Sequence, residues 1–134
     1  MSTRNRIDAL LEVSKAFPAA AANNTTDAID LRQVPAGELE NIVVELDIPA
    51  TTTLVADKTA TFTFQHKAAA TDSFADTDPV ISKIVTGKSG NGSDAAKVQF
   101  RLPPGCKRYI AMKCAVLTGG GDNTAKSYTL RVLT

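Results

Sequence analysis

The chain has 134 residues, of which 43% are hydrophobic and 22% are charged, and its formal net charge is +1. This length is that of one domain with room for a sizeable hydrophobic core, and a near-neutral charge argues against binding nucleic acid or an anionic membrane by overall electrostatic attraction. No apolar run approaches the roughly 20 residues of a membrane-spanning helix. We expect no secretory signal peptide, because Asp8 and Glu12 interrupt the apolar stretch near the start.

The first 24 residues are predicted to form an N-terminal arm that packs on the domain or on a neighbouring molecule. Ile7, Leu10 and Leu11 fit one face of a helix. Leu11 and Val13 also fit the alternating pattern of a strand, so the secondary structure of the arm stays open. Residues 25–134 are assigned to the main domain.

Alternation of apolar and polar residues with a period of two predicts strands in the rest of the chain. Clear segments lie at 41–48, 59–67, 98–102, 110–116 and 128–133, and weaker ones at 27–32 and 80–85. The chain is therefore expected to be an all-β protein, an antiparallel β-sandwich or jelly roll with an N-terminal arm. The glycine-rich run 119–123 is expected to join the last two strands as a hairpin.

Threonine is unusually frequent on the predicted outward faces of the strands. The chain has 16 threonines and 20 alanines but no tryptophan. In the segment 59–67, Phe62 and Phe64 point to one side, and Thr59, Thr61 and Thr63 point to the other. Such a face can pack against another protein without exposing a large apolar patch.

Charge is distributed unevenly along the chain. Residues 88–134 carry eight Lys or Arg and two Asp, a net charge of +6, and residues 1–87 carry seven basic and twelve acidic residues, a net charge of −5. Separate acidic and basic faces would suit docking onto a partner or onto further copies. Alternatively, strands from the two parts interleave in the sandwich and mix the charges. The pattern leaves both arrangements open.

Few residues are available for catalysis or metal binding. His66 is the only histidine, and it lies on the same side of its strand as Phe62 and Phe64. Cys106 and Cys114 are too far apart for a C-x-x-C pair, and they lack the partners of a zinc site. We therefore expect two free thiols, no cofactor, no metal and no enzymatic activity.

Two polar segments are candidate contact sites. The stretch from Asp72 to Asp78 holds three carboxylates, but it lacks the glycine and the closing glutamate of an EF-hand. A solvated loop is preferred over a calcium site, with Phe74 anchored in the core or in a partner. Lys107 and Arg108 begin a strand, without the aromatic platform that single-stranded nucleic acid needs.

Three stretches match a known protein family in their order and spacing. They are residues 7–16, the segment Ala28–Leu31 with its Ile-Asp-Leu sequence, and Leu102–Ile110 with a Leu-Pro-x-Gly turn followed by Arg-Tyr-Ile. In these stretches the chain resembles the small jelly-roll cement, or decoration, proteins of tailed bacteriophages. The resemblance is to those that accompany the major capsid protein in short-tailed phages, and it covers nearly the full length.

The resemblance implies a structural virion protein. Such proteins are made in the bacterial cytoplasm, bind the outer surface of the capsid, and tie neighbouring capsomers together against the pressure of the packaged DNA. The implied partners are the major capsid protein and further copies of the chain, a dimer slightly ahead of a trimer, with no nucleic acid or membrane. The residues expected to contact the capsid or another subunit are Ile7, Leu10, Leu11, Val13, Phe17, Phe74, Lys107 and Arg108.

Two other functions fit a β-sandwich. One is a carbohydrate-binding or adhesin-type module, for which the absence of tryptophan leaves only Tyr109 and Tyr128 to stack on a sugar ring. The other is a small hydrolase of the cupin kind, which would need several metal-binding histidines where the chain has one. The structural role is therefore preferred over both.

Overall fold

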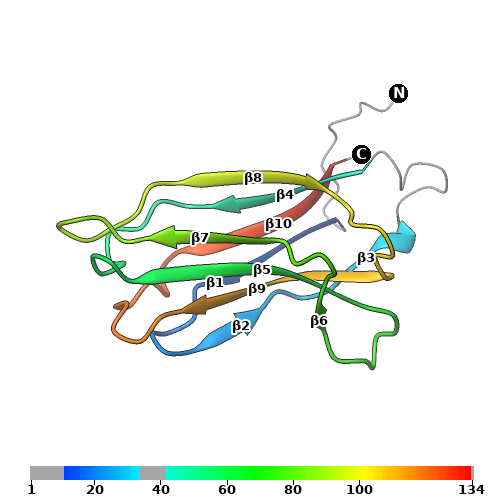
Figure 1. The fold of residues 1–134 in the computed structure, drawn as a ribbon, viewed down its shortest axis with the longest axis horizontal. Helices are drawn as coiled ribbons and strands as arrows, with labels where there is room; N and C mark the ends of the chain where they lie inside the picture. The colour runs from blue at the N-terminus through cyan, green and yellow to red at the C-terminus, as the bar shows by residue number, and fades with distance from the viewer. Residues whose placement is uncertain (1–10, 34–41, 134) are drawn as a thin grey trace.

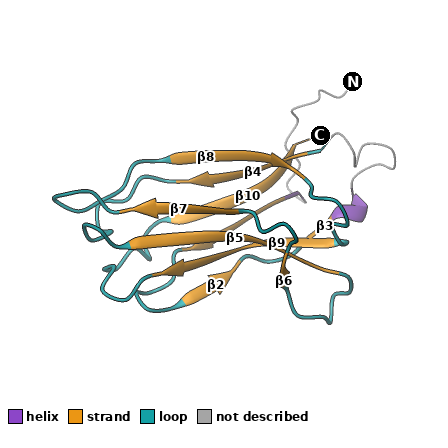
Figure 2. Ribbon diagram, viewed as in Figure 1, coloured by secondary structure: helices purple, strands orange, loops and turns teal. Residues whose placement is uncertain are grey.

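The computed structural model describes residues 11–33 and 42–133, and in these residues the chain forms two facing antiparallel sheets (Figure 1). The four-stranded sheet contains β1 (Glu12–Ala16), β4 (Val43–Ile48), β8 (Ala96–Arg101) and β10 (Ser127–Leu133). The six-stranded sheet contains β2 (Asn23–Thr25), β3 (Ile29–Asp30), β5 (Thr59–Lys67), β6 (Ala75–Asp76), β7 (Ser82–Thr86) and β9 (Tyr109–Val116). A short 3-10 turn, η2 (Leu31–Gln33), follows β3 (Figure 2). The prediction of an all-β sandwich is confirmed.

The strand order is that of a jelly roll. It is β1-β10-β4-β8 in the four-stranded sheet and β2-β9-β5-β6 in the six-stranded sheet, where β3 also pairs with β9 and β7 also pairs with β5. If β2 with β3, and β6 with β7, are each counted as one interrupted strand, the eight strands divide equally between the two sheets. All connections but the one after β5 then cross from one sheet to the other, which is the arrangement of two wound Greek keys.

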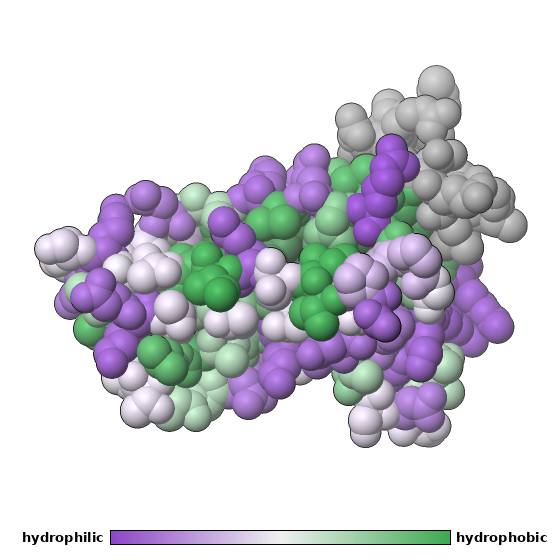
Figure 3. Space-filling model, in the orientation of Figure 1, coloured by the Kyte–Doolittle hydropathy of each residue, from purple (hydrophilic) through white to green (hydrophobic). Residues whose placement is uncertain are grey.

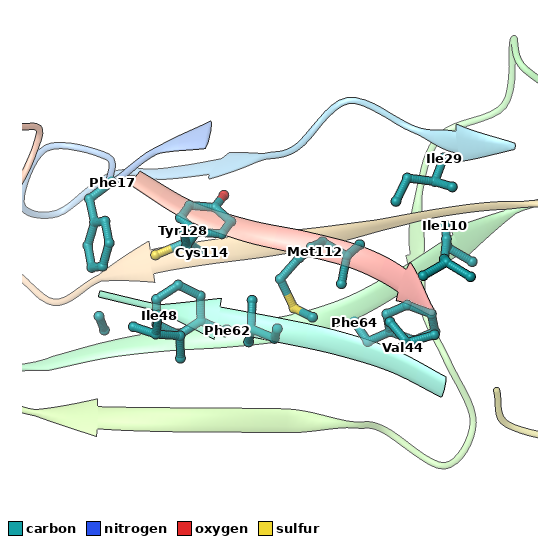
Figure 4. Packing of buried hydrophobic residues seen from close by; sticks show 14 of the residues in the cluster. Phe17, Ile29, Val44, Ile48, Phe62, Phe64, Ile110, Met112, Cys114 and Tyr128 are labelled. Atoms are coloured by element: carbon teal, nitrogen blue, oxygen red, sulfur yellow. The ribbon is translucent and has the colours of Figure 1, made fainter. Parts of the chain in front are cut away.

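The core lies between the sheets and follows the predicted alternation. Ile42, Leu46 and Ile48 on the inner side of the four-stranded sheet are at most 1% exposed. Phe17, Phe62 and Tyr128 meet edge to face within the core, with ring centroids 5.2 to 5.9 Å apart (Figure 4). Such aromatic contacts add to the stabilisation that burial of the rings provides.

The described part of the predicted arm, residues 11–24, belongs to the sandwich, which corrects the expected boundary at residue 24. β1 pairs with β10 in one sheet, and β2 pairs with β9 in the other. Phe17, between these two strands, is 2% exposed and belongs to the aromatic cluster of the core. Sequence alternation is weak here because β1 has only five residues and β2 only three.

The predicted hairpin at 119–123 is wrong, because β9 and β10 lie in different sheets. Both edges of β9 are already paired, and so are both edges of β10. The glycines instead allow this run to pass close to residues 53–55. A Cβ atom on Gly121 would lie 2.5 Å from the Thr53 carbonyl oxygen, and the Gly120 carbonyl accepts a hydrogen bond from the Val55 amide.

Candidate interaction face

Over β2, β7, residues 59–63 of β5 and residues 113–115 of β9, the outer side of the six-stranded sheet carries small and mostly uncharged side chains, and we call this part the threonine–alanine face. The rest of that side, around β3 and β6, carries the charged residues Asp30, Lys67 and Asp76 and lies outside it. Strand register places ten residues on it: Asn23, Thr25, Thr59, Thr61, Thr63, Ser82, Ile84, Thr86, Lys113 and Ala115. In Figure 3, pale surface with separate green patches covers the region of β5 and β7. Ile84 is 56% exposed, and Leu117 beyond the end of β9 is 49% exposed. The face is therefore flat, neutral and weakly apolar.

A shallow hollow of about 270 Å³ lies at one end of this face. Its floor and walls include Asn23, Thr59, Thr61, Ala115 and the exposed Leu117. No aromatic or charged side chain of the described residues lines it. The hollow thus lacks the ring that would stack on a sugar and the charged groups that would catalyse a reaction.

Lys113 is the one charged side chain among the described residues of the threonine–alanine face. Its neighbours on the adjacent strands are Thr25 and Thr63, and it makes no ion pair with the part of the chain that the structure describes. A partner that covers this face therefore gains if it places a carboxylate opposite Lys113.

The outer side of the four-stranded sheet, which we call the charged face, differs in kind. Arg131 on β10 lies between acidic residues of β1 and β4. Its Nη1 is 2.6 Å from Glu45 Oε1 and 3.4 Å from Asp47 Oδ2, and its Nε is 3.4 Å from Glu12 Oε1. The second oxygen of Glu45 accepts a hydrogen bond of 2.7 Å from Gln99. These groups satisfy one another within the chain.

Burial makes this network matter for stability. Glu45 is only 6% exposed, which alone would raise its pKa, but the hydrogen bonds from Gln99 and Arg131 overcome this effect and lower the pKa. Of the two arrangements that the uneven charge along the chain left open, this sheet shows the mixed one. Basic β8 and β10 from the later part of the chain lie beside acidic β4 from the earlier part. On this sheet, folding mixes the charges.

The structure places the predicted contact residues of the arm in three situations. Ile7 and Leu10 lie outside the described residues. Leu11 and Phe17 are 4% and 2% exposed and belong to the chain's own core, so they offer no surface to a partner, which corrects that expectation. Val13 on β1 is half-buried against the same core.

The other three predicted contact residues lie at the end of the sandwich where β9 begins. Lys107 is exposed, and Phe74 is half-buried with the Lys67 ammonium 4.4 Å from its ring centroid. Arg108 donates two hydrogen bonds of 2.9 Å to the carboxylate of Asp30. The side-chain hydrogen bonds from Arg108 lower the pKa of Asp30 to about 2. Arg108 therefore anchors β3 to β9 within the chain.

His66 and the two thiols are in structural surroundings. His66 Nδ1 accepts a hydrogen bond of 3.2 Å from the Lys107 amide, and burial and the nearby Lys107 charge lower the pKa of the imidazole. Cys106 and Cys114 are free thiols, as expected. Burial raises their pKa values to about 11 and about 12, so neither is a thiolate nucleophile near neutral pH.

Two of the three carboxylates of the acidic loop accept local hydrogen bonds. Asp76 accepts one from Gln65, and Asp72 accepts one from the Ala69 amide. Over residues 11–33 and 42–133, no group of three His, Cys, Asp or Glu side chains is placed to hold a metal ion. Within the same residues, no helix has the length and apolar character needed to cross a membrane.

Sequence reasoning identified the threonine side of β5, but it missed how far the neutral surface extends. Alternation in β5 pointed to Thr59, Thr61 and Thr63. The contributions of β2, β7 and β9 depend on strand register, and no local pattern reports it. The exposure of Ile84 was also missed, because an isolated isoleucine in a strand is usually read as a core residue.

No protein-family model and no curated protein sequence matches this chain. Jelly rolls carry many unrelated functions, so the fold alone does not identify one.

Proposed function

We propose that this chain is a structural virion protein, a cement or decoration protein that binds the outer surface of a bacteriophage capsid and stabilises contacts between capsomers of the major capsid protein. The observation that carries the proposal is the threonine–alanine face, which offers a broad neutral surface. On the opposite, charged face, the charged side chains form ion pairs with one another. The resemblance of three sequence stretches to the phage cement proteins supports the same function.

The stretches that carry the resemblance have a structural role here. Asp30, in the Ile-Asp-Leu stretch, binds Arg108 of the Arg-Tyr-Ile stretch, and Ile29 lies opposite Ile110 in the β3–β9 pairing. Motifs that meet in this way define a fold, so they support kinship with the jelly-roll cement proteins. The docking residues have to be sought elsewhere, on the free surface.

The threonine–alanine face suits a contact with a protein shell for physical reasons. Thr and Ala lose little side-chain entropy when an interface orders them. A face with one charge loses little hydration energy when it is covered, whereas covering the charged face would remove water from several ions at once. Exposed Ile84 and Leu117 add apolar contact area.

Repetition on a lattice makes a modest contact sufficient. A shell presents the same site many times, and copies that also touch each other bind by avidity. Contacts around two-fold or three-fold axes would link copies into dimers or trimers, with the dimer as the first expectation. The hollow does not support the alternative of a carbohydrate-binding module, because none of the described residues that line the hollow is aromatic.

The test is co-sedimentation of the purified chain with empty capsids of the bacteriophage that encodes it. Thr61→Lys adds a charge to the threonine–alanine face, and Thr129→Lys makes the same change on the charged face as a matched control. Both positions are partly exposed and lie on paired central strands. We expect the T61K variant to bind about tenfold more weakly and the T129K variant to bind within about twofold of wild type.

Two results would overturn the proposal. One is a wild-type chain that stays in the supernatant with capsids in excess. The other is an equal loss of binding in both variants, which would show that the threonine–alanine face is not the docking surface. Thermal unfolding of both variants confirms that they are folded.

A further inference from the structure

The two lateral sides of the sandwich are closed to different degrees. On the side of β1 and β2, Asn24 Nδ2 donates a hydrogen bond of 2.7 Å to the Ala16 carbonyl and so joins the two sheets. Asn24 Oδ1 accepts another of 2.7 Å from the Tyr128 hydroxyl, and Phe17 fills the space beneath. This side is sealed by the chain itself.

The side of β7 and β8 remains open as a narrow crevice. It is lined by Val98 and Phe100 of β8, by Lys83 of β7, and by the core side chains Phe62 and Met112. Its volume of about 10 Å³ holds no more than about one water molecule. In Figure 3, green surface is visible between β8 and β7, bordered by purple. Because nothing larger than a water molecule can enter the crevice, a binding partner would have to lie over it.

β8 has a free edge beside the crevice. It pairs with β4 on one side, and its residues 96–100 make no further backbone pairing with the part of the chain that the structure describes. Val98 and Phe100 point inward yet are only half-buried, whereas Val44 and Leu46, opposite them on β4, are at most 1% exposed. An added strand would satisfy the free backbone groups and complete the burial of both side chains.

The charges at this edge select the chemistry of the added strand. Along this edge, β7 carries Lys83 and residues 96–100 of β8 carry Lys97, and both are basic. A second copy pairing through β8 would bring like charges together, which destabilises a strand pair. An acidic strand would be attracted instead.

The other edge of β8 already shows which strand pattern fits. On β4, Leu46 and Ile48 face the core, Glu45 accepts the hydrogen bond from Gln99, and Asp47 lies opposite Lys97. The pattern is therefore apolar residues inward and acidic residues outward, at every second position.

From the free edge, the half-buried apolar residues and the basic border, we propose that β8 binds an extended segment of a partner protein by strand addition, and that this segment alternates apolar and acidic residues. The site is separate from the threonine–alanine face and goes beyond the cement function. Its partner is defined by chemistry: an unpaired strand with carboxylates on one side and aliphatic side chains on the other.

The test uses a fluorescein-labelled peptide with the sequence of residues 41–49 of this chain as the probe. A second peptide with the changes E45K and D47K reverses the charges. Binding is measured by fluorescence anisotropy, and the site is mapped from amide shifts of the 15N-labelled protein. We expect the acidic peptide to bind, the shifts to centre on residues 96–101, and the basic peptide to bind about tenfold more weakly.

Charge reversal in the protein sharpens the test. Lys83→Glu with Lys97→Glu should weaken the acidic peptide about tenfold and strengthen the basic one. Lys15→Glu makes the same kind of change on β1, at the sealed side, and should leave both affinities unchanged, as should T61K. All three lysines are exposed, and Lys83→Glu alone serves if the double variant unfolds.

Several outcomes would overturn the proposal. These are no binding of the acidic peptide at millimolar concentration, equal weakening by Lys15→Glu, or shifts centred on β1. Shifts centred on β10 would show that the peptide replaces β4 in the sheet, and would overturn it as well.

Discussion

The outer faces of the two sheets show two ways in which a strand surface can meet water. On the charged face, Arg131 holds Glu12, Glu45 and Asp47, and the groups satisfy one another. On the threonine–alanine face, Lys113 lies among small neutral side chains and has no ion-pair partner among the described residues. The first face contributes to the stability of the chain, and the second is free to contribute to binding.

This difference follows from what each face would lose in an interface. Ion pairs that are already formed gain little from a partner and must be dehydrated if they are covered. Small neutral side chains have little hydration to lose and few rotamers to restrict. Mutations on the two faces should therefore separate stability from binding.

The largest expected effect is that of Arg131→Met on stability. Arg131 has a side chain 14% exposed, and its removal leaves the buried carboxylate of Glu45 without its closest cation. We expect the free energy of unfolding to fall by about 3 kcal/mol, measured by urea denaturation. The matched change on the other face, Lys113→Met, should alter it by less than about 0.5 kcal/mol. Equal losses would mean that the two faces do not differ in this way.

Lowering the pH is expected to reduce the free energy of unfolding by a smaller amount. Hydrogen bonds from Arg108 hold the pKa of Asp30 at about 2, against an ordinary value of 3.8. The stabilisation is therefore fully present above pH 3.8 and is lost as the pH falls through about 2. Glu45, whose pKa is also lowered, acts in the same direction.

The measurement is the free energy of unfolding as a function of pH. Asp30→Asn and Glu45→Gln should each make the decline below pH 4 shallower than in wild type. Thr61→Val, on the face without carboxylates, should leave the slope as it is. A wild-type curve that is flat over this range would contradict the prediction.

The smallest expected effect is that of Thr63→Val on stability. The Thr63 hydroxyl is partly exposed on the threonine–alanine face and makes no hydrogen bond to a described residue, so the change should be within about 0.5 kcal/mol. The control is Thr51→Val, because the buried Thr51 hydroxyl lies 2.9 Å from that of Ser93. Losing that bond should cost about 1 kcal/mol in thermal or urea unfolding. A larger loss for Thr63→Val would show that the face has a structural role.

Much of the strand pattern could be predicted from local alternation. β5 has the predicted bounds, and β9 and β10 differ from the prediction by one residue at their starts. β2, with the polar sequence Asn-Asn-Thr, has no alternation to detect. It forms because β9 offers an edge to it, and a partner of this kind is invisible to a pattern that is read along the chain.

The candidate face and the ion pairs were predictable only in part. The threonines of β5 were identified, but the partner of Arg108 lies 78 residues away in sequence. The run 119–123 was expected to form a hairpin because glycines usually mark tight turns. Here they permit a close approach between loops.

By itself, the sequence determined the fold class, the inner and outer sides of the principal strands, and the presence of a single histidine. These properties depend on residue type and on a period of two, which are local. Tertiary structure decided which sheet each strand joins, whether charges are paired or left free, and that residues 11–24 complete both sheets. Those outcomes depend on contacts between residues far apart in the chain, and only folding brings such residues together.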